Sequence, residues 1–143
     1  MLILIMADAC SKKASQKGEM ALTISSHKTG DKVVNFMPLT MKGSIKGYES
    51  MPADKKKNLH LYLVEQSTQE RIWHIEPEAK IDAKGDWSAV TWLGKRHEKN
   101  DNNFHVCAVA LDKHLKLKNG NHPVKEKPAG MGETCIDLER QMP

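Results

Sequence analysis

The stretch Asn103-Phe-His-Val-Cys-Ala-Val-Ala-Leu111 decides the fold class of this chain. Apolar side chains occupy every second position of it, beginning at Phe104. Successive side chains of an extended strand point to opposite faces, so this spacing predicts a β-strand with one face in the core. The stretch Glu133-Thr-Cys-Ile-Asp-Leu-Glu139 repeats the pattern, with Ile136 and Leu138 on the inward face.

The same two-residue period recurs over most of the chain. It is found in five further segments: 20–26, 39–46, 59–64, 71–75 and 86–93. No window of 11 or more residues carries a helical pattern of comparable clarity. Seven short strands separated by turn residues predict an all-β protein, an immunoglobulin-like antiparallel β-sandwich of about seven strands. An open barrel such as an OB-fold is the structural alternative, and it has fewer strands.

Length and composition bound the domain organisation. The chain has 143 residues, which is enough for one domain. With 39% hydrophobic and 28% charged residues, it is too apolar for a disordered chain and too polar for a membrane protein. We expect residues 1–19 to be a signal remnant or disordered linker and residues 20–143 to form one immunoglobulin-like domain.

A turn motif carries a resemblance to a known class of modules. The stretch Asp82-Ala-Lys-Gly-Asp-Trp-Ser88 has the pattern D-x-x-G-x-W, and it resembles the turn and strand of bacterial immunoglobulin-like modules, in which a glycine turn feeds a tryptophan into the core. The order of the flanking strands extends the resemblance over about residues 20–140. The resemblance implies an extracytoplasmic structural or adhesive module without shared catalytic residues.

Cys10 raises the question of lipidation. It follows a short apolar stretch and small residues and precedes the polar segment 11–16, which resembles the end of a bacterial lipoprotein signal. The apolar run of about five residues is shorter than the usual 7–15 and has no preceding basic residue. A disordered N-terminus with an incidental cysteine is the alternative. A lipid on Cys10 would tether the domain to a membrane.

The other two cysteines are predicted to face each other. If the last two strands pair with Cys107 opposite Cys135, then His105 meets Asp137 and the apolar positions also match. Directly opposed residues of antiparallel strands lie about 4.5–5.5 Å apart at Cα, within disulfide range. We expect a disulfide in an oxidising compartment, with Cys135 on the outward face beside Asp137 and Glu139. The alternative is two free thiols, with Cys107 buried as a small hydrophobe.

Three histidines point away from the apolar sets of their strands. His60, His74 and His105 would lie on the outer face of one sheet, together with Tyr62. Converging imidazoles are good zinc or copper ligands, so these three residues are a candidate metal site. An ordinary solvated sheet face with alternating polar residues is the alternative.

Lysines gather in two predicted loops, whereas the net charge of the whole chain is only +4. In an immunoglobulin-like sandwich both loops emerge at one end, which would then dock on a protein or an anionic envelope component. The candidate residues are Lys55, Lys56, Lys57, Lys113, Lys116, Lys118, Lys125 and Lys127. The mild net charge disfavours nucleic acid as the partner. The alternative is that these lysines only solubilise the loops.

No catalytic motif stands out. The chain has no G-x-S-x-G elbow, phosphate-binding glycine loop or H-E-x-x-H motif, so we expect no enzyme activity and no cofactor. The predicted function is that of a binding or structural module of the bacterial cell envelope. The alternatives are a soluble intracellular β-sandwich that regulates a partner protein, and a metal- or carbohydrate-binding module. An exposed Trp92 beside Tyr62 would favour the carbohydrate alternative.

Overall fold

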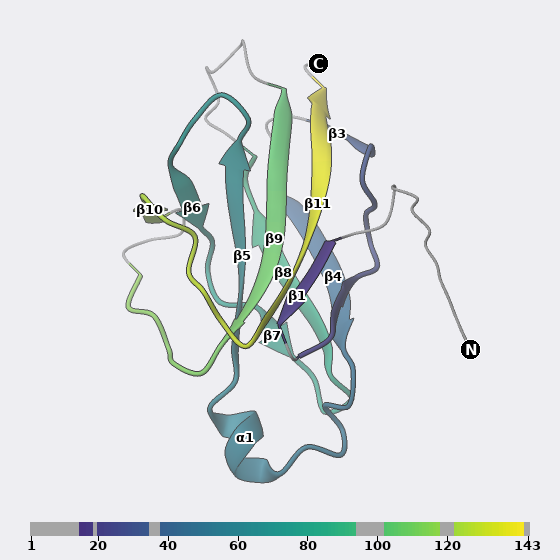
Figure 1. Ribbon diagram of the computed structural model, residues 1–143. Helices are drawn as coiled ribbons and strands as arrows, with labels where there is room; N and C mark the ends of the chain where they lie inside the picture. The colour runs from purple at the N-terminus through teal and green to yellow at the C-terminus, as the bar shows by residue number, and fades with distance from the viewer. Residues whose placement is uncertain (1–14, 19, 35–37, 94–101, 118–121, 142–143) are drawn as a thin grey trace, which may run out of the picture.

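The computed structural model describes residues 15–18, 20–34, 38–93, 102–117 and 122–141. Within these residues, two β-sheets lie face to face around an apolar interior (Figure 1). The all-β sandwich that the alternating pattern predicts is therefore confirmed. No helix in the described part of the chain is long and apolar enough to cross a membrane.

The larger sheet contains seven strands. They are β1 (Ser15–Gly18), β3 (Lys32–Val34), β5 (His60–Ser67), β6 (Trp73–Ile75), β9 (Asn103–Leu111), β10 (His122–Val124) and β11 (Gly132–Gln141). Six of them follow the order β1-β11-β9-β5-β6-β10, and β3 pairs with the far end of β11. The β3–β11 pair is parallel, and the other pairs of this sheet are antiparallel.

The smaller sheet has four antiparallel strands in the order β2-β4-β8-β7. Their bounds are β2 (Leu22–Ile24), β4 (Leu39–Ile45), β7 (Lys80–Ile81) and β8 (Asp86–Thr91). The one helix among the described residues, α1 (Ala53–Lys57), is short, follows β4 and lies at one end of the sandwich (Figure 1).

Each of the seven segments predicted as strands contains one, namely β2, β4, β5, β6, β8, β9 and β11. The structure adds four strands of two to four residues, which are β1, β3, β7 and β10. Strand β1 lies within residues 1–19, where we predicted a signal remnant or linker, and pairs with β11 from Ser15↔Cys135 to Gly18↔Gly132. The expected linker therefore contributes its last residues to the edge of the sheet.

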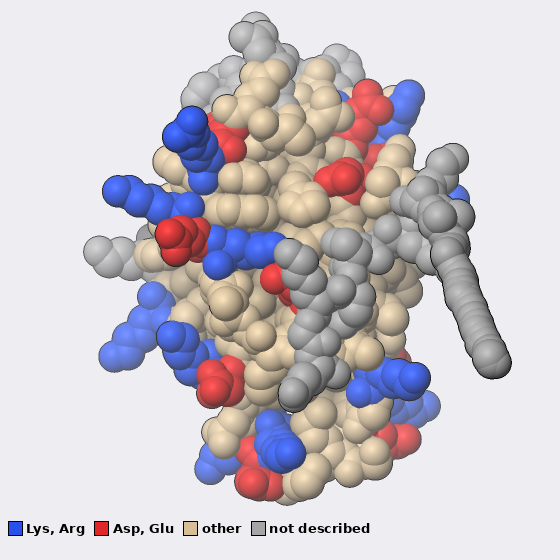
Figure 2. Space-filling view, in the orientation of Figure 1, with Lys and Arg blue, Asp and Glu red and all other residues tan. Residues whose placement is uncertain are grey.

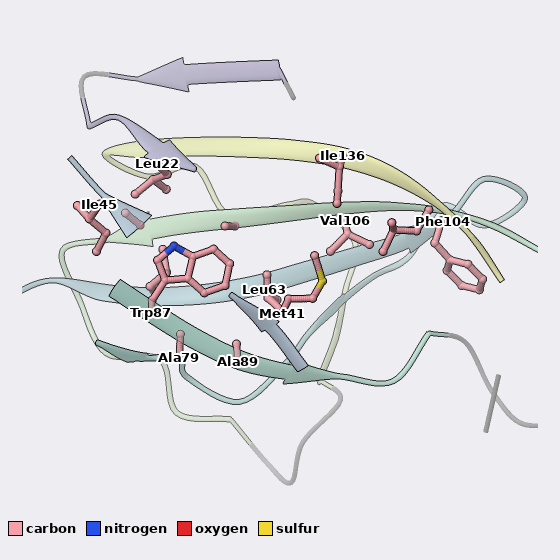
Figure 3. Packing of buried hydrophobic residues seen from close by; sticks show 14 of the residues in the cluster. Leu22, Met41, Ile45, Leu63, Ala79, Trp87, Ala89, Phe104, Val106 and Ile136 are labelled. Atoms are coloured by element: carbon pink, nitrogen blue, oxygen red, sulfur yellow. The ribbon is translucent and has the colours of Figure 1, made fainter. Parts of the chain in front are cut away.

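The interior between the sheets is built from the alternating positions of both. Figure 3 shows Met41 and Trp87 of the smaller sheet and Leu63 and Val106 of the larger sheet pointing into the space between them. Each of these side chains is at most 2% exposed. Burial of a side chain of this kind contributes about 1.5–3 kcal/mol, so this interior supplies most of the driving force for folding.

The D-x-x-G-x-W turn forms as the sequence pattern suggests. The Asp82 carboxylate accepts hydrogen bonds from the backbone N–H groups of Lys84 (2.9 Å) and Asp86 (3.0 Å), and Gly85 adopts a positive φ of 94°. Trp87 then enters the core opposite Gly43. A Cβ atom on Gly43 would lie 2.5 Å from the Trp87 ring, so the tryptophan requires glycine at that position.

The outer face of the larger sheet carries a second apolar cluster. Its buried members are Tyr62, Val64, Ile75, Cys107, Val109, Leu111 and Cys135. Partly buried side chains from β6, from β10 and from segment 112–117 pack against it: Trp73, Val124, Leu115 and Leu117. The larger sheet is thus covered on both faces, whereas the sequence pattern predicted an outward face open to solvent.

Candidate functional site

Cys107 and Cys135 form a disulfide between β9 and β11. Their Cα atoms are 4.0 Å apart, and the strands pair in the predicted register, with Cys107 opposite Cys135. In the same register His105 faces Asp137, and 2.6 Å separates the His105 Nδ1 atom from the Asp137 Oδ1 atom. The bond thus links β9 and β11 within the outer cluster.

Cys135 lies on the outward face of its strand, as predicted, but that face is not open to solvent there. Cys135 is 4% exposed and Cys107 is fully buried, and the ammonium group of Lys127, in the segment after β10, lies 3.9 Å from the Cys107 Sγ atom. Lys127 of this segment forms an ion pair with Glu133, and its ammonium nitrogen lies 5.2 Å from the centre of the Trp73 ring. Lys127, which we predicted to contact an anionic partner, therefore contacts Glu133 and Trp73 beside the disulfide.

The three predicted histidine ligands do not converge. His60, His74 and His105 all belong to the larger sheet, but His74 pairs with Glu65 and so lies on the opposite face from His60 and His105. His60 pairs with Leu111, six residues along β9 from His105, which separates the two by roughly 20 Å. The metal site predicted from these three residues is therefore wrong.

His60 instead meets two residues that the sequence pattern did not single out. The Glu78 carboxylate lies between two imidazoles, with 2.9 Å from Oε2 to the His60 Nδ1 atom and 2.9 Å from Oε1 to the His114 Nδ1 atom. One ligand-type atom from each of the three residues lies within 4.8 Å of the others. His60 and Glu78 are partly buried, and His114 is 62% exposed. The group is therefore open to solvent on one side.

Two irregular segments bring these side chains together. Segment 76–79 continues along the edge of β5, where Glu76 N–H donates to the Leu63 carbonyl and Ala79 N–H donates to the Leu61 carbonyl. This pairing holds Glu78 beside the outer face of β5. Segment 112–117 crosses the same face, and Leu115 N–H donates to the Tyr62 hydroxyl oxygen at 2.8 Å.

The electrostatics of the group follow from this packing. Burial would raise the pKa of Glu78, but the hydrogen bonds from His60 and His114 outweigh it and hold that pKa below its ordinary value. Burial raises the pKa of Tyr62, a hydrogen bond from Leu115 N–H opposes the rise, and the negative charge of Glu78 adds to it. At neutral pH the site therefore holds one carboxylate beside a neutral phenol.

The predicted lysine surface is divided among several segments. Lys55, Lys56 and Lys57 form the last turn of α1, Lys113 and Lys116 lie in segment 112–117, and Lys125 and Lys127 follow β10. Lys118 and the lipidation candidate Cys10 lie outside the described residues. Figure 2 shows acidic side chains interspersed among the basic ones on the face in view.

A hollow of about 920 Å³ lies beside α1, and it is lined by residues 20–21, 46–47, 51–52, 54–55, 58, 112 and 130–131. Its charged residues are Lys46, Lys55, Asp54 and Asp112, so the two signs balance there. The ammonium group of Lys56 donates to the Glu49 carbonyl and lies above the Tyr48 ring. Lys55 and Lys57 are the exposed cations of the helix.

The tryptophans fall into three environments. Trp87 is 2% exposed in the interior, as predicted, and Trp73 packs at the edge of the outer cluster. Trp92 is 49% exposed next to the end of β8 in the smaller sheet, whereas Tyr62 is fully buried in the larger sheet. The combined Trp92 and Tyr62 face that would favour carbohydrate binding is therefore absent from the described residues.

Only one of the three residues of the histidine and carboxylate group could be found from the sequence. His60 was recognised because it alternates with the leucines of β5. Glu78 and His114 lie in segments without a repeating pattern, whose paths depend on tertiary packing. No family model, no curated protein and no solved structure matches this chain, so the inferences below depend on its own residues.

Proposed function

We propose that this chain is a non-enzymatic binding or structural module that functions in an oxidising compartment, such as the bacterial cell envelope. The observation that carries the proposal is the Cys107–Cys135 disulfide. Disulfides persist in secreted and envelope proteins, whereas cytosolic reductants keep thiols reduced. Since this disulfide is buried within the outer cluster, it fits a permanent structural role better than a reversible one.

The strand order supports an immunoglobulin-like assignment. The smaller sheet, β2-β4-β8-β7, has the same sequential order as the A-B-E-D sheet of immunoglobulin domains. The central strands of the larger sheet, β5-β9-β11, follow the C-F-G order. Modules of this architecture commonly act by binding, through loops at the ends of the sandwich.

For the partner, we propose a protein or an anionic envelope component that contacts the α1 end. Lys55 and Lys57 are exposed there, and Asp112, which lines the same hollow as Lys55, is followed by the exposed Lys113. Binding to vesicles containing anionic lipid should weaken as salt rises from low to physiological ionic strength, because exposed charges are screened. Salt-independent binding would contradict this part of the proposal.

The experiment that tests the compartment is a thiol-trapping measurement on protein from its native host. Cells are lysed in denaturant that contains an alkylating reagent, so that buried thiols also react, and the intact mass is recorded with and without prior reduction. The proposal expects Cys107 and Cys135 to be protected from alkylation until the protein is reduced. The same spectrum tests Cys10 for an attached lipid. Complete alkylation without reduction would instead support the intracellular alternative.

A further inference from the structure

Two imidazoles and one carboxylate from three separate segments meet at one partly exposed point of the larger sheet. His60 begins β5, Glu78 lies in the segment after β6, and His114 lies in the segment after β9. The two imidazole rings are 5.6 Å apart at their centres and face each other edge to face. Hydrogen bonds alone account for the arrangement in the absence of a ligand. The same nitrogen and oxygen atoms are also of the kinds that bind metal ions.

We propose that His60, Glu78 and His114 form a binding site for a divalent transition-metal ion of the zinc class. Two histidine nitrogens and a carboxylate oxygen are a donor set that zinc accepts, with a fourth position left to water or a ligand. The 62% exposure of His114 provides that open side. The proposal does not depend on the compartment in which the protein functions, because none of the three residues belongs to the disulfide.

The spacing of the donor atoms suits a tetrahedral ion. Bonds of about 2.0–2.1 Å place the ligand atoms of tetrahedral zinc roughly 3.3 Å apart. The two imidazoles contact different oxygens of Glu78, each at 2.9 Å, and one ligand atom from each of the three residues lies within 4.8 Å of the others. Small rotations of these side chains therefore bring the three atoms to the spacing that the ion requires. A neutral imidazole carries its single proton on either nitrogen. Moving that proton to Nε2 frees the Nδ1 lone pair that faces the carboxylate.

Tyr62 is placed to orient the ligands. Its hydroxyl lies 3.3 Å from the Glu78 Oε1 atom and 3.4 Å from the His114 Nδ1 atom, and it accepts the backbone hydrogen bond of Leu115. The Tyr62 ring is fully buried in the outer cluster, which fixes the position of the hydroxyl. Hydrogen bonds of this kind, one step removed from the ion, fix ligand geometry in metal sites.

A second group of metal-binding residue types can be set aside. His105 lies near Cys107 and Cys135, but zinc binds cysteine as the thiolate, and these two sulfurs are bonded to each other. Among the described residues of the oxidised protein, metal binding is therefore assigned to His60, Glu78 and His114. The ion would connect segment 112–117 to β5 and to segment 76–79.

The test is a zinc titration of the oxidised full chain, followed by calorimetry and by thermal unfolding. We expect binding of one ion per chain. An ion that binds only the folded state stabilises it by mass action, so zinc at about 100 times its Kd should raise Tm by about 5–10 °C. His114→Ala removes an exposed ligand without opening the core, and Glu78→Gln removes the carboxylate charge. Each should weaken zinc binding by at least about tenfold.

The matched control is His27→Ala, which removes a histidine that contacts Ser26 far from the group. It should bind zinc as the unaltered chain does. Co²⁺, which replaces zinc, should give the visible absorption of a tetrahedral site in the unaltered chain and in His27→Ala, but not in His114→Ala. Absence of zinc binding at millimolar metal would overturn the proposal. So would equal weakening in His27→Ala, or no weakening in either ligand variant.

Discussion

The two faces of the larger sheet are covered in different ways. On the inner face, β5, β9 and β11 pack against the regular strands of the smaller sheet. On the outer face, the same three strands are covered by short strands and irregular segments that carry Trp73, Leu115, Leu117 and Val124. The inner cluster includes eighteen buried residues of the described chain and the outer cluster seven, so the inner one contributes more apolar burial.

The comparison shows how the two clusters obtain their stability. The inner cluster is closed by two sheets whose backbone hydrogen bonds are satisfied within each sheet. The outer cluster is closed by segments with few such bonds, and it contains the disulfide and the Tyr62 hydroxyl, which hold it together by covalent and polar links. We therefore expect the outer cover to open at a lower cost than the sandwich itself.

The largest expected loss of stability comes from truncating a leucine of the inner cluster, and the matching truncation in the outer cluster is its comparison. Leu63 is fully buried in the interior, and Leu117 packs partly buried against the outer cluster. Leu63→Ala should lower the free energy of unfolding by about 2–5 kcal/mol, because it removes apolar contacts and leaves a cavity. Leu117→Ala should cost about 1 kcal/mol, because part of its surface is already in water and the site lies at the edge of the cluster. Urea unfolding monitored by tryptophan fluorescence measures both.

This pair of variants tests the comparison directly, because the chemical change is the same in both. Equal losses would show that the outer cover is as tightly coupled to folding as the interior is. A loss for Leu117→Ala larger than that for Leu63→Ala would reverse our ranking of the two clusters.

The next effect concerns the disulfide. Its two cysteines are separated by 28 residues, and a loop of that length constrains the unfolded chain by about 3–4 kcal/mol. The double variant Cys107→Ala and Cys135→Ala should lose roughly that much free energy of unfolding in non-reducing buffer. Cys10→Ser, which leaves the cross-link intact, is the control. If the double variant unfolds at the same urea concentration as the control, the disulfide does not stabilise this fold.

The pairing of β9 with β11 could be predicted from the sequence for a physical reason. Side chains alternate strictly between the faces of a strand, so a shift by one residue would place Ile136 and Leu138 on the wrong face. Only a register that matches the apolar positions buries the apolar side chains of both strands in the interior. That register also places Cys107 opposite Cys135. The same alternation identified seven of the eleven strands in the described part of the chain.

The outer cluster was missed, although part of its signal is present in the sequence. Residues 106–111 are apolar without interruption, and so are three of the four residues 61–64, with tyrosine as the fourth. Continuous apolar runs are typical of strands that are buried on both faces, and we interpreted them by alternation alone. The cover itself has no comparable signal, because the paths of segments 76–79 and 112–117 follow from packing rather than from a repeating pattern. For that reason His114 could not be placed beside His60.

The smallest expected effect concerns the polar link of the outer cover. Tyr62→Phe keeps the buried ring but removes the oxygen that accepts the hydrogen bond of Leu115 N–H and the proton donated to Glu78. We expect a loss of about 1 kcal/mol in the free energy of unfolding. Tyr48→Phe also removes a hydroxyl and keeps a ring, but in the inner cluster, and it should lower the free energy of unfolding by less. Urea unfolding of the two variants side by side makes the comparison.

The ionisation of Tyr62 offers a second measurement of the same link. Burial and the negative charge of Glu78 raise the pKa of Tyr62 above its ordinary value of 10.0. The hydrogen bond from Leu115 N–H lowers this pKa, but by less than burial raises it. The folded state therefore holds this proton more tightly than the unfolded state, so the contribution to stability is complete below about pH 10 and is lost as pH rises through the folded pKa. The chain has two tyrosines, so Tyr48→Phe leaves Tyr62 as the sole phenol. Its phenolate absorbance should rise with a midpoint above 10.0 while the chain is folded and at a lower pH in urea. A folded midpoint no higher than the unfolded one would mean that the outer cover leaves Tyr62 open to water.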